Sequence, residues 1–275
     1  MTLNNPFYEI IDEEIRTEVE KHGDVLLSRD PALSVEKQTE EIEDLIREGV
    51  SVIFLNPVDF ERMGPALEAA RAAHIPVVTI DTNVQDSDFV ASTIETDNYA
   101  AGRACAEHLL QHADHANILL LKHSSAHSAV DRITGFRQTI AGHPGFTIVD
   151  EAECDGQLER AMPAMQEMLS RHPEADTVMA LNDPSALGAM AALESCGRLQ
   201  SFRVYGVDGV PETKELILAG RMTATAAQSP RRIGRLAAQQ AYRLLDGEPV
   251  DRLIQLPTHL WTQENLTPAK TKEWD

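Results

Sequence analysis

The chain has few cysteines, few basic residues and no long apolar run. Its three cysteines, Cys105, Cys154 and Cys196, form no CxxC pair. An odd, sparse count of this kind excludes a disulfide framework. Lysine and arginine total 24 against 44 aspartates and glutamates, a formal charge of −20, so nucleic acid and anionic lipid would repel the chain. No stretch approaches the roughly 20 apolar residues of a membrane span.

The usual signatures of catalysis and cofactor binding are also missing. No GxGxxG or GxxxxGK[ST] motif occurs, which argues against dinucleotides and nucleoside triphosphates. No GxSxG elbow occurs either, so Ser124, His127 and Asp131 resemble a catalytic triad in composition only. The histidines around His108 lack the cysteine or carboxylate partners of a zinc site. We therefore expect a protein that is not an enzyme and holds no cofactor or metal.

Short apolar runs alternate with helical stripes along most of the chain. The runs predict strands at 24–28, 50–55, 77–81, 116–121, 147–150, 177–181, 203–207 and 222–226. A helix is predicted between Ser34, a capping residue, and Gly49, which can end it. Another helix is predicted with Asp183 as its cap and Pro184 in its first turn. Uninterrupted apolar strands that alternate with helices predict an α/β fold with parallel sheets covered on both faces. A length of 275 residues suits two modest lobes.

The first predicted helix, which begins near Pro6, has no strand before it. Asn5-Pro6 is typical of a helix cap and first turn, and only Met1-Thr2-Leu3 remains where a strand should be. Either the sequence starts late, having lost a strand and a signal peptide, or the fold has one strand fewer. We favour the late start.

Polar or aromatic residues stand where most of these strands end or the following helices begin. They are Asn5, Phe7, Tyr8, Asp81, Arg132, Asn182, Asp208 and Gln228. The carboxyl ends of parallel strands line the crevice where ligands bind. Carboxylates, amides and an arginine can bond hydroxyl groups, and an aromatic ring can pack on a sugar's C–H face. Singly, each residue could be a cap, a turn former or a solvated side chain. Together, at equivalent strand ends, they predict a sugar pocket.

Several motifs follow one another in the order and spacing of a known family. They cover residues 4–8, 53–57, 76–81, 96–98, 132–136, 181–183, 186–189, 205–209 and 224–228. Through them the chain resembles the ribose-binding-protein-like periplasmic solute-binding proteins, whose type I fold is shared with LacI-type effector domains. The resemblance implies two doubly wound, Rossmann-like lobes, 1–95 with 229–257 and 96–228 with 258–275. A three-segment hinge would join them near 95–97, 228–229 and 256–258.

The resemblance also implies a role for each matched position. The family's hydrogen-bonding set is matched by Asn5, Asp81, Arg132, Asn182, Asp208 and Gln228. Phe7 and Tyr8 match the aromatic residues that pack on the sugar ring. Two positions depart from ribose binders: Thr82 replaces an arginine, and Cys154 stands where a second-lobe aromatic would face Phe7. Both departures argue against ribose itself as the ligand.

A missing first strand would have a structural consequence. In this family that strand is central in its sheet. The resemblance therefore predicts a gap beside 25–28 or 50–55 in the first lobe, with unpaired backbone groups and an apolar slot.

The function implied by the resemblance is reversible capture of a monosaccharide or polyol by two lobes that close on it. The implied partners are the membrane subunits of an ABC importer or a chemoreceptor, with no nucleic acid, no membrane insertion and a monomeric state. The implied location is the periplasm or cell surface after export of a longer precursor, or the cytoplasm if Met1 is the natural start. The main alternative is the effector domain of a LacI-type regulator, although 260–266 resembles the tails of transport binding proteins. An enzyme on a doubly wound sheet is the second alternative.

Overall fold

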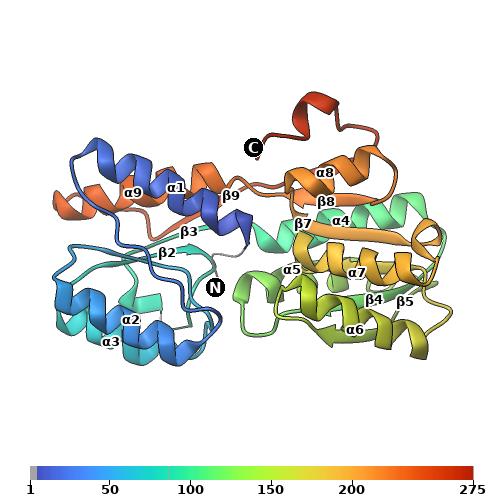
Figure 1. Cartoon of the computed structure of the whole chain (residues 1–275), viewed down its shortest axis with the longest axis horizontal. Coiled ribbons are helices and arrows are strands. Elements are labelled where there is room, and N and C mark those ends of the chain that lie inside the picture. The colour runs from blue at the N-terminus through green and yellow to red at the C-terminus, as the bar shows by residue number, and fades with distance from the viewer. Residues whose placement is uncertain (1–4, 86, 275) are drawn as a thin grey trace. The chain divides into compact units, whose positions relative to one another are not determined.

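The computed structural model describes residues 5–85 and 87–274, and the chain divides into two compact units (Figure 1). The first unit contains Met1–Thr96, Ser125–Ser128 and Ser229–Leu256, and the second contains Asp97–Ser124, Ala129–Gln228 and Pro257–Asp275. Each unit is built on a mainly parallel sheet with helices on both faces. The predicted α/β class with two doubly wound sheets is therefore confirmed.

The sheet of the first unit has four parallel strands in the order β1-β2-β3-β9. They are β1 (Ile53–Leu55), β2 (Val77–Asp81), β3 (Ser92–Thr96) and β9 (Leu253–Leu256). Every residue of β2 is buried, as its uninterrupted apolar run predicted. Because the strands are parallel, the residues that follow β1 and β2 lie at the same edge of the sheet.

Two pairs of helices cover this sheet. Helices α1 (Pro6–Lys21) and α9 (Pro230–Leu245) pack together on one face, and α2 (Val35–Glu48) and α3 (Gly64–Ala72) pack on the other (Figure 1). A short helix, η1 (Ser87–Phe89), precedes β3. Helix α1 buries apolar residues four positions apart from Phe7 to Val19, the stripe that faces a core. Helix α2 begins after its cap Ser34 and ends at Gly49, as predicted.

One predicted strand of the first unit is absent, and another is shorter than expected. Residues 24–28 form neither helix nor strand, and the side chain of Val25 is 78% exposed. A strand needs a neighbour for its backbone groups, and among the described residues nothing pairs with this segment. The run 50–55 is reduced to β1 for the same reason, because only one of its edges is paired.

The sheet of the second unit has six strands in the order β10-β8-β7-β6-β4-β5, and only β10 is antiparallel to its neighbour. They are β4 (Ala116–Lys122), β5 (Phe146–Glu153), β6 (Thr177–Ala180), β7 (Arg203–Asp208), β8 (Ala224–Ala227) and β10 (His259–Thr262). Each of the strands predicted from 116 to 226 is present within a few residues of its expected bounds.

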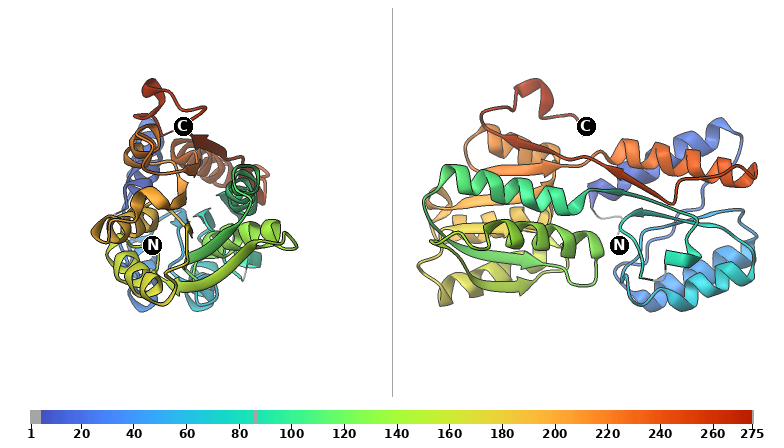
Figure 2. Two further views of the ribbon diagram at one scale, coloured as in Figure 1. Left: turned by 90° about the vertical axis from the view of Figure 1, so that its right-hand side faces the viewer. Right: turned by 180° about the vertical axis from the view of Figure 1, so that it is seen from behind.

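The helices of the second unit also lie on both faces of their sheet. They are α4 (Asn98–His112), α5 (His127–Ile140), α6 (Leu158–Arg171), α7 (Asp183–Ser195) and α8 (Pro211–Leu218), with short helices η2 (Leu199–Ser201) and η3 (Pro268–Lys270). Helices α4 and α5 cover one face, and α6, α7 and α8 cover the other (Figures 1 and 2). Within residues 5–85 and 87–274, no helix is both long and apolar enough to span a membrane.

Candidate ligand-binding site

In the first unit, three polar side chains meet at the carboxyl edge of the sheet. The hydroxyl of Tyr8 donates to Asp81 Oδ2 at 3.2 Å. Asn56 Nδ2 donates to the carbonyl of Ile80 at 3.0 Å and lies 3.3 Å from the same Asp81 oxygen. We call Tyr8, Asn56 and Asp81 the first-unit cluster. Asn56 was not predicted as a site residue, although Asn56 follows the strand β1 much as Asp81 follows the apolar run of β2.

The backbone of Asp81 is left-handed, with φ 67°. For a residue other than glycine this conformation costs roughly 1–2 kcal/mol, and such strain is concentrated at ligand sites. Thr82 follows in a tight turn in which its N–H donates to Ile80 O at 2.8 Å. The hydroxyl of Thr82 is buried and accepts from the N–H of Ser128 at 3.1 Å. Thr82 therefore fixes local backbone in addition to lying beside Asp81.

The first turn of α1 carries the other predicted residues of this unit. Asn5 caps the helix, because its Oδ1 accepts from the N–H of Phe7 at 3.0 Å. The rings of Phe7 and Tyr8 meet edge to face with centroids 5.4 Å apart, and Phe7 is buried. The cap thus sets the direction of both aromatic side chains.

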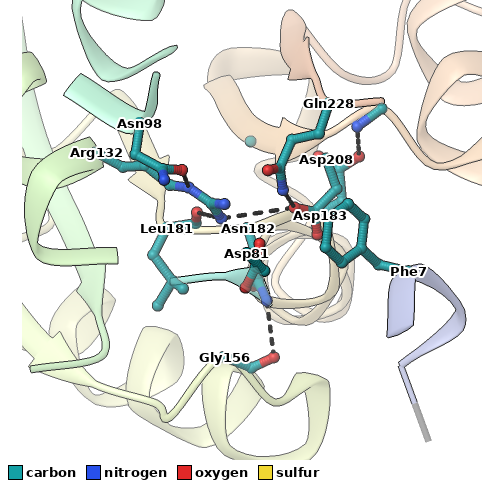
Figure 3. Close-up of polar contacts among 12 residues, drawn as sticks. Phe7, Asp81, Asn98, Arg132, Gly156, Leu181, Asn182, Asp183, Asp208 and Gln228 are labelled. Atoms are coloured by element: carbon teal, nitrogen blue, oxygen red, sulfur yellow. Dashed lines mark hydrogen bonds and ion pairs between the residues drawn. The ribbon is translucent and has the colours of Figure 1, made fainter. Parts of the chain in front are cut away.

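In the second unit, an arginine and a carboxylate form the centre of the polar contacts (Figure 3). Arg132 Nε donates to Asn98 Oδ1 at 2.8 Å, and Arg132 Nη1 donates to the carbonyl of Leu181 at 3.0 Å. The same nitrogen lies 3.5 Å from Asp208 Oδ1. Gln228 Nε2 donates to that oxygen at 2.8 Å. We call Asn98, Arg132, Asp208 and Gln228 the second-unit cluster.

The burial of this cluster excludes a solvated surface role for Arg132, whose exposed fraction is 4%. Asp208 resembles Asp81 in two respects: it is the last residue of its strand, β7, and its backbone has a positive φ, here 131°. Gln228 Oε1 is buried and accepts no hydrogen bond from the described residues. Buried acceptors are normally satisfied, so this oxygen is available to a ligand hydroxyl. Asn98 was not predicted as a site residue, although it stands in the matched motif 96–98.

Asn182 and Cys154 are engaged by their own neighbourhood. Asn182 Oδ1 accepts from the N–H and the hydroxyl of Ser185, at 3.0 and 2.6 Å, and its Nδ2 donates to Gly156 O at 3.1 Å (Figure 3). Asn182 is therefore the cap of α7, and the cap role proposed for the next residue, Asp183, is wrong. Cys154 Sγ lies 3.3 Å from Ser185 Oγ, and burial raises the pKa of this thiol.

Asp183 has a different role from a cap. Its Oδ2 accepts from the N–H groups of Gly209 and Val210, both at 2.9 Å, and from Thr213 Oγ1 at 2.6 Å. Its Oδ1 accepts from Thr225 Oγ1 at 2.7 Å. Burial raises the pKa of Asp183 to about 6 in spite of these bonds. The carboxylate joins α7, the β7–α8 turn and β8, and so supports the backbone on which the second-unit cluster is placed.

The donor set of these clusters is suited to an organic polar ligand. Within residues 5–85 and 87–274, no group of three or more histidine, cysteine, aspartate and glutamate side chains could hold a metal ion. Each cluster instead combines a carboxylate with amide groups, the combination that bonds hydroxyl groups. Residues 1–249 match the periplasmic binding protein domain family.

The chain belongs to this family. It is 32% identical to the ribose import binding protein RbsB of Salmonella typhimurium over 251 residues, 90% of this chain and 84% of that protein. It is 33% identical to RbsB of Bacillus subtilis over 265 residues, 96% and 85% of the two chains.

Solved structures agree with these relatives. An ABC transporter solute binding protein from Mycobacterium smegmatis, solved with bound glycerol, is 35% identical with a TM-score of 0.90, over 96% of this chain and 92% of that one. The binding component of the arabinose ABC transporter from Shewanella sp. ANA-3, bound to L-arabinofuranose, is 26% identical with a TM-score of 0.91, over 98% and 92%. The expected type I fold is thus confirmed. The chain is a solute-binding protein and not an enzyme.

Proposed function

We propose that this periplasmic binding protein serves an ABC-type importer and captures an uncharged monosaccharide or polyol. One observation is the main support for this class of ligand. Each unit presents a buried carboxylate at the carboxyl end of a strand, with positive φ and an amide partner: Asp81 with Asn56, and Asp208 with Gln228. Carboxylates accept hydrogen bonds from hydroxyl groups strongly, because the bonds are charge-assisted.

The charges at the two clusters favour a neutral ligand. The only cation of the second-unit cluster, Arg132, lies 3.5 Å from Asp208, which balances its charge. The first-unit cluster contains a carboxylate and no cation. A phosphate or carboxylate on the ligand that lay near Asp81 would face a group of like charge, which disfavours it. The names of the relatives support the same choice, since they bind ribose, glycerol and arabinofuranose.

Capture would follow the mechanism implied by the family. The proposed lobes, 1–95 with 229–257 and 96–228 with 258–275, close on the ligand about the three-segment hinge, and Asn5, Phe7 and Tyr8 contribute to the first lobe's side of the pocket. Thr82, Cys154 and Asn182 complete the proposed ligand set. The membrane subunits of the importer recognise the closed, monomeric form outside the cytoplasmic membrane. Ligand binding shifts the equilibrium because it contacts both lobes only when they are closed.

The proposal is tested by thermal shift with a panel of solutes. The panel contains D-ribose, D-allose, L-arabinose, xylitol, glycerol and myo-inositol, with ribose 5-phosphate, glutamate and AMP as charged comparisons. At least one neutral solute should raise the Tm, and the rise should grow with the logarithm of its excess over Kd. If only the charged solutes raise the Tm, the proposed ligand class is wrong. Uptake of the best solute by a strain lacking this gene then separates an importer component from a regulator's effector domain.

A further inference from the structure

The carboxyl edge of the second-unit sheet contains a buried histidine that the proposed ligand set does not use. His123 is the first residue after β4, and its exposed fraction is 5%. In the strand order, β4 lies between β6 and β5, so His123 comes from the interior of the sheet and not from its margin. Ligands of open parallel sheets bind outside the carboxyl ends of the strands. A buried titratable side chain at this edge is therefore a candidate for contact with the ligand.

The register between β4 and β5 places His123 beside a residue of the proposed ligand set. Lys122, the residue before His123, pairs with Glu153, the residue before Cys154. The N–H of Cys154 donates to the carbonyl of Lys122 at 2.9 Å, so the ladder between the two strands is intact up to this point. One residue further along both strands, His123 is level with Cys154.

The other neighbour of β4 has a corresponding residue. Leu121 pairs with Ala180 of β6. Two residues further along both strands, His123 is level with Asn182, whose backbone is still extended. His123 therefore lies between Cys154 and Asn182 in one row across three neighbouring strands, and both of these neighbours belong to the proposed ligand set.

The side chains of this row also approach one another. Asn182 Oδ1 and Cys154 Sγ both contact Ser185 Oγ, at 2.6 and 3.3 Å, so the two side chains lie on the same face of the sheet. Asn182 Nδ2 donates to Gly156 O at 3.1 Å (Figure 3). A Cβ added to Gly156 would lie 3.0 Å from this Nδ2 and 3.7 Å from His123 Nδ1. The imidazole of His123 and the amide of Asn182 therefore flank the same point.

The adjacent cysteine and histidine form neither a catalytic pair nor a metal site. Burial raises the pKa of the Cys154 thiol, so the thiol stays protonated, and only a thiolate is a good nucleophile or metal ligand. Among the residues that the structure describes, His123 is in no group of three or more histidine, cysteine, aspartate and glutamate side chains that could hold a metal ion. A neutral imidazole has one donor and one acceptor nitrogen, so it can bond a hydroxyl group in either direction.

We propose that His123 is a ligand-binding residue of the second unit and bonds a hydroxyl group of the captured solute. This inference rests on the proposed function, because it adds His123 to the residues that bind an uncharged monosaccharide or polyol. A site that bonds a hydroxyl group through buried polar side chains rejects an analogue without it, because those side chains lose their partner. His123 is thus a residue that determines which neutral solutes the protein accepts.

The experiment compares variants of His123 in the full chain. The probes are D-ribose, D-allose, L-arabinose, xylitol, glycerol and myo-inositol, and the one that raises the Tm of the parent most is used for calorimetry. His123→Phe keeps a ring without nitrogens and should raise the Kd of this probe about fivefold or more, which corresponds to one lost hydrogen bond. His123→Gln keeps a donor and an acceptor and should stay within about threefold of the parent. The control His115→Phe changes an exposed histidine directly before β4, at the opposite edge of the sheet, and should bind like the parent.

Monodeoxy forms of the same probe test the contact itself. Removal of one particular hydroxyl group should weaken binding to the parent and have little effect on binding to His123→Phe, because that hydroxyl has already lost its partner. Two losses that do not add identify groups in direct contact. A merely structural role of His123 would instead lower the affinity for every deoxy form by the same factor as for the probe.

Nitrogen NMR of the parent supplies a measurement that needs no folded variant. Saturation with the probe should shift the ring nitrogens of His123 and leave those of His115 unchanged. If the probe binds the parent but shifts neither ring nitrogen of His123, or if the losses add for every hydroxyl group, His123 is not a ligand residue and the proposed function still stands. If none of the probes raises the Tm of the parent, this inference and the proposed function are both wrong.

Discussion

Arg132 Nη1 lies 3.5 Å from Asp208 Oδ1, and both side chains are buried. The same carboxylate oxygen accepts from Gln228 Nε2 at 2.8 Å, and the N–H of Gln228 donates to the carbonyl of Asp208 at 3.0 Å. The carboxylate at the end of β7 is therefore held by side chains from two other segments of the second unit, α5 and the end of β8. An acceptor held this firmly loses little conformational entropy when a ligand binds, which favours affinity.

Removal of either strand-end carboxylate should weaken binding of the neutral solute found in the thermal-shift panel. Asp208→Ala and Asp81→Ala each remove charge-assisted hydrogen bonds and leave ligand hydroxyls unpaired. The expected loss is roughly 1.5–3 kcal/mol of binding free energy for each, measured by calorimetry. The control is Asp114→Ala, at an exposed position before β4, which should bind like the parent. Unchanged affinity in both test variants would place the ligand elsewhere.

Asn98 should act on the ligand through Arg132. Asn98 is buried, and its Oδ1 accepts from Arg132 Nε at 2.8 Å. Asn98→Ala removes that acceptor and lets the guanidinium turn, so affinity should fall by about 1 kcal/mol, the usual worth of one hydrogen bond.

Asn98→Asp keeps an acceptor at the same place and should restore most of the affinity. As a control, Tyr99→Phe removes only the exposed hydrogen bond to Gln138 and should have no effect on binding. If the Asp variant binds as poorly as the Ala variant, Asn98 does not act by positioning Arg132.

Local patterns in the sequence predicted those parts of the fold that depend on local chemistry. Residues 77–81 are apolar without interruption and form β2 at the expected bounds. Ser34 and Gly49 delimit α2 because capping requires only nearby backbone groups. The segment 24–28 has the composition of a strand and forms none, because pairing depends on a neighbour that composition does not reveal. The strands β3, β9 and β10 were not predicted, and in β9 and β10 exposed residues interrupt the apolar pattern.

The candidate site could also be predicted only as far as it depends on local patterns in the sequence. The sequence places Asp81 and Asp208 at strand ends. Their positive φ values arise from the turns that follow, and after Asp81 no glycine indicates such a turn. The sequence predicts Asp183 as a cap because the partners of its carboxylate, such as Thr213 and Thr225, lie 30 and 42 residues away in sequence. Contacts over that distance are decided by the sheet order, which the local pattern does not contain.

The stability of the protein should depend on pH through Asp183. Burial raises the pKa of this carboxyl from its usual 3.8 to about 6 in the folded state. Because the pKa of Asp183 is higher in the folded state than in the unfolded state, the protonated carboxyl favours folding. The stabilisation of the folded state by this group is fully present below pH 4 and is lost as the pH rises toward 6. The free energy of unfolding should therefore fall by about 3 kcal/mol across this range relative to Asp183→Asn, measured by urea unfolding at each pH.

The direction of this difference decides between burial and hydrogen bonding. If the parent gains stability relative to Asp183→Asn between pH 4 and 6, the bonds from Gly209, Val210 and the two threonines outweigh burial, and the expectation is wrong. Should the Asn variant not fold, Thr213→Val serves instead. It removes the 2.6 Å bond to Asp183 Oδ2, so the fall in stability should move to higher pH.

Gly102 should be irreplaceable at the contact between α4 and α5. A Cβ added there would lie 1.8 Å from the carbonyl oxygen of Arg132 and 3.0 Å from the N–H nitrogen of Phe136. Both atoms belong to backbone, so the two helices would have to separate. Gly102→Ala should gain about 1 kcal/mol of helix propensity and still lose about 1–3 kcal/mol of stability net, because overpacking displaces backbone. Since the displaced residue is Arg132, affinity for the neutral solute should fall as well.

Gly142→Ala provides the comparison for Gly102→Ala. Gly142 has a φ of 81° and no atom within 4 Å of an added Cβ, so its substitution strains the backbone by about 1–2 kcal/mol without touching Arg132. The two variants can therefore lose similar stability in urea unfolding, but only Gly102→Ala should weaken binding by calorimetry. If Gly142→Ala weakens binding equally, the loss reflects general destabilisation. If Gly102→Ala binds like the parent, the position of the Arg132 backbone does not control the site, and the close approach of α4 and α5 serves packing alone.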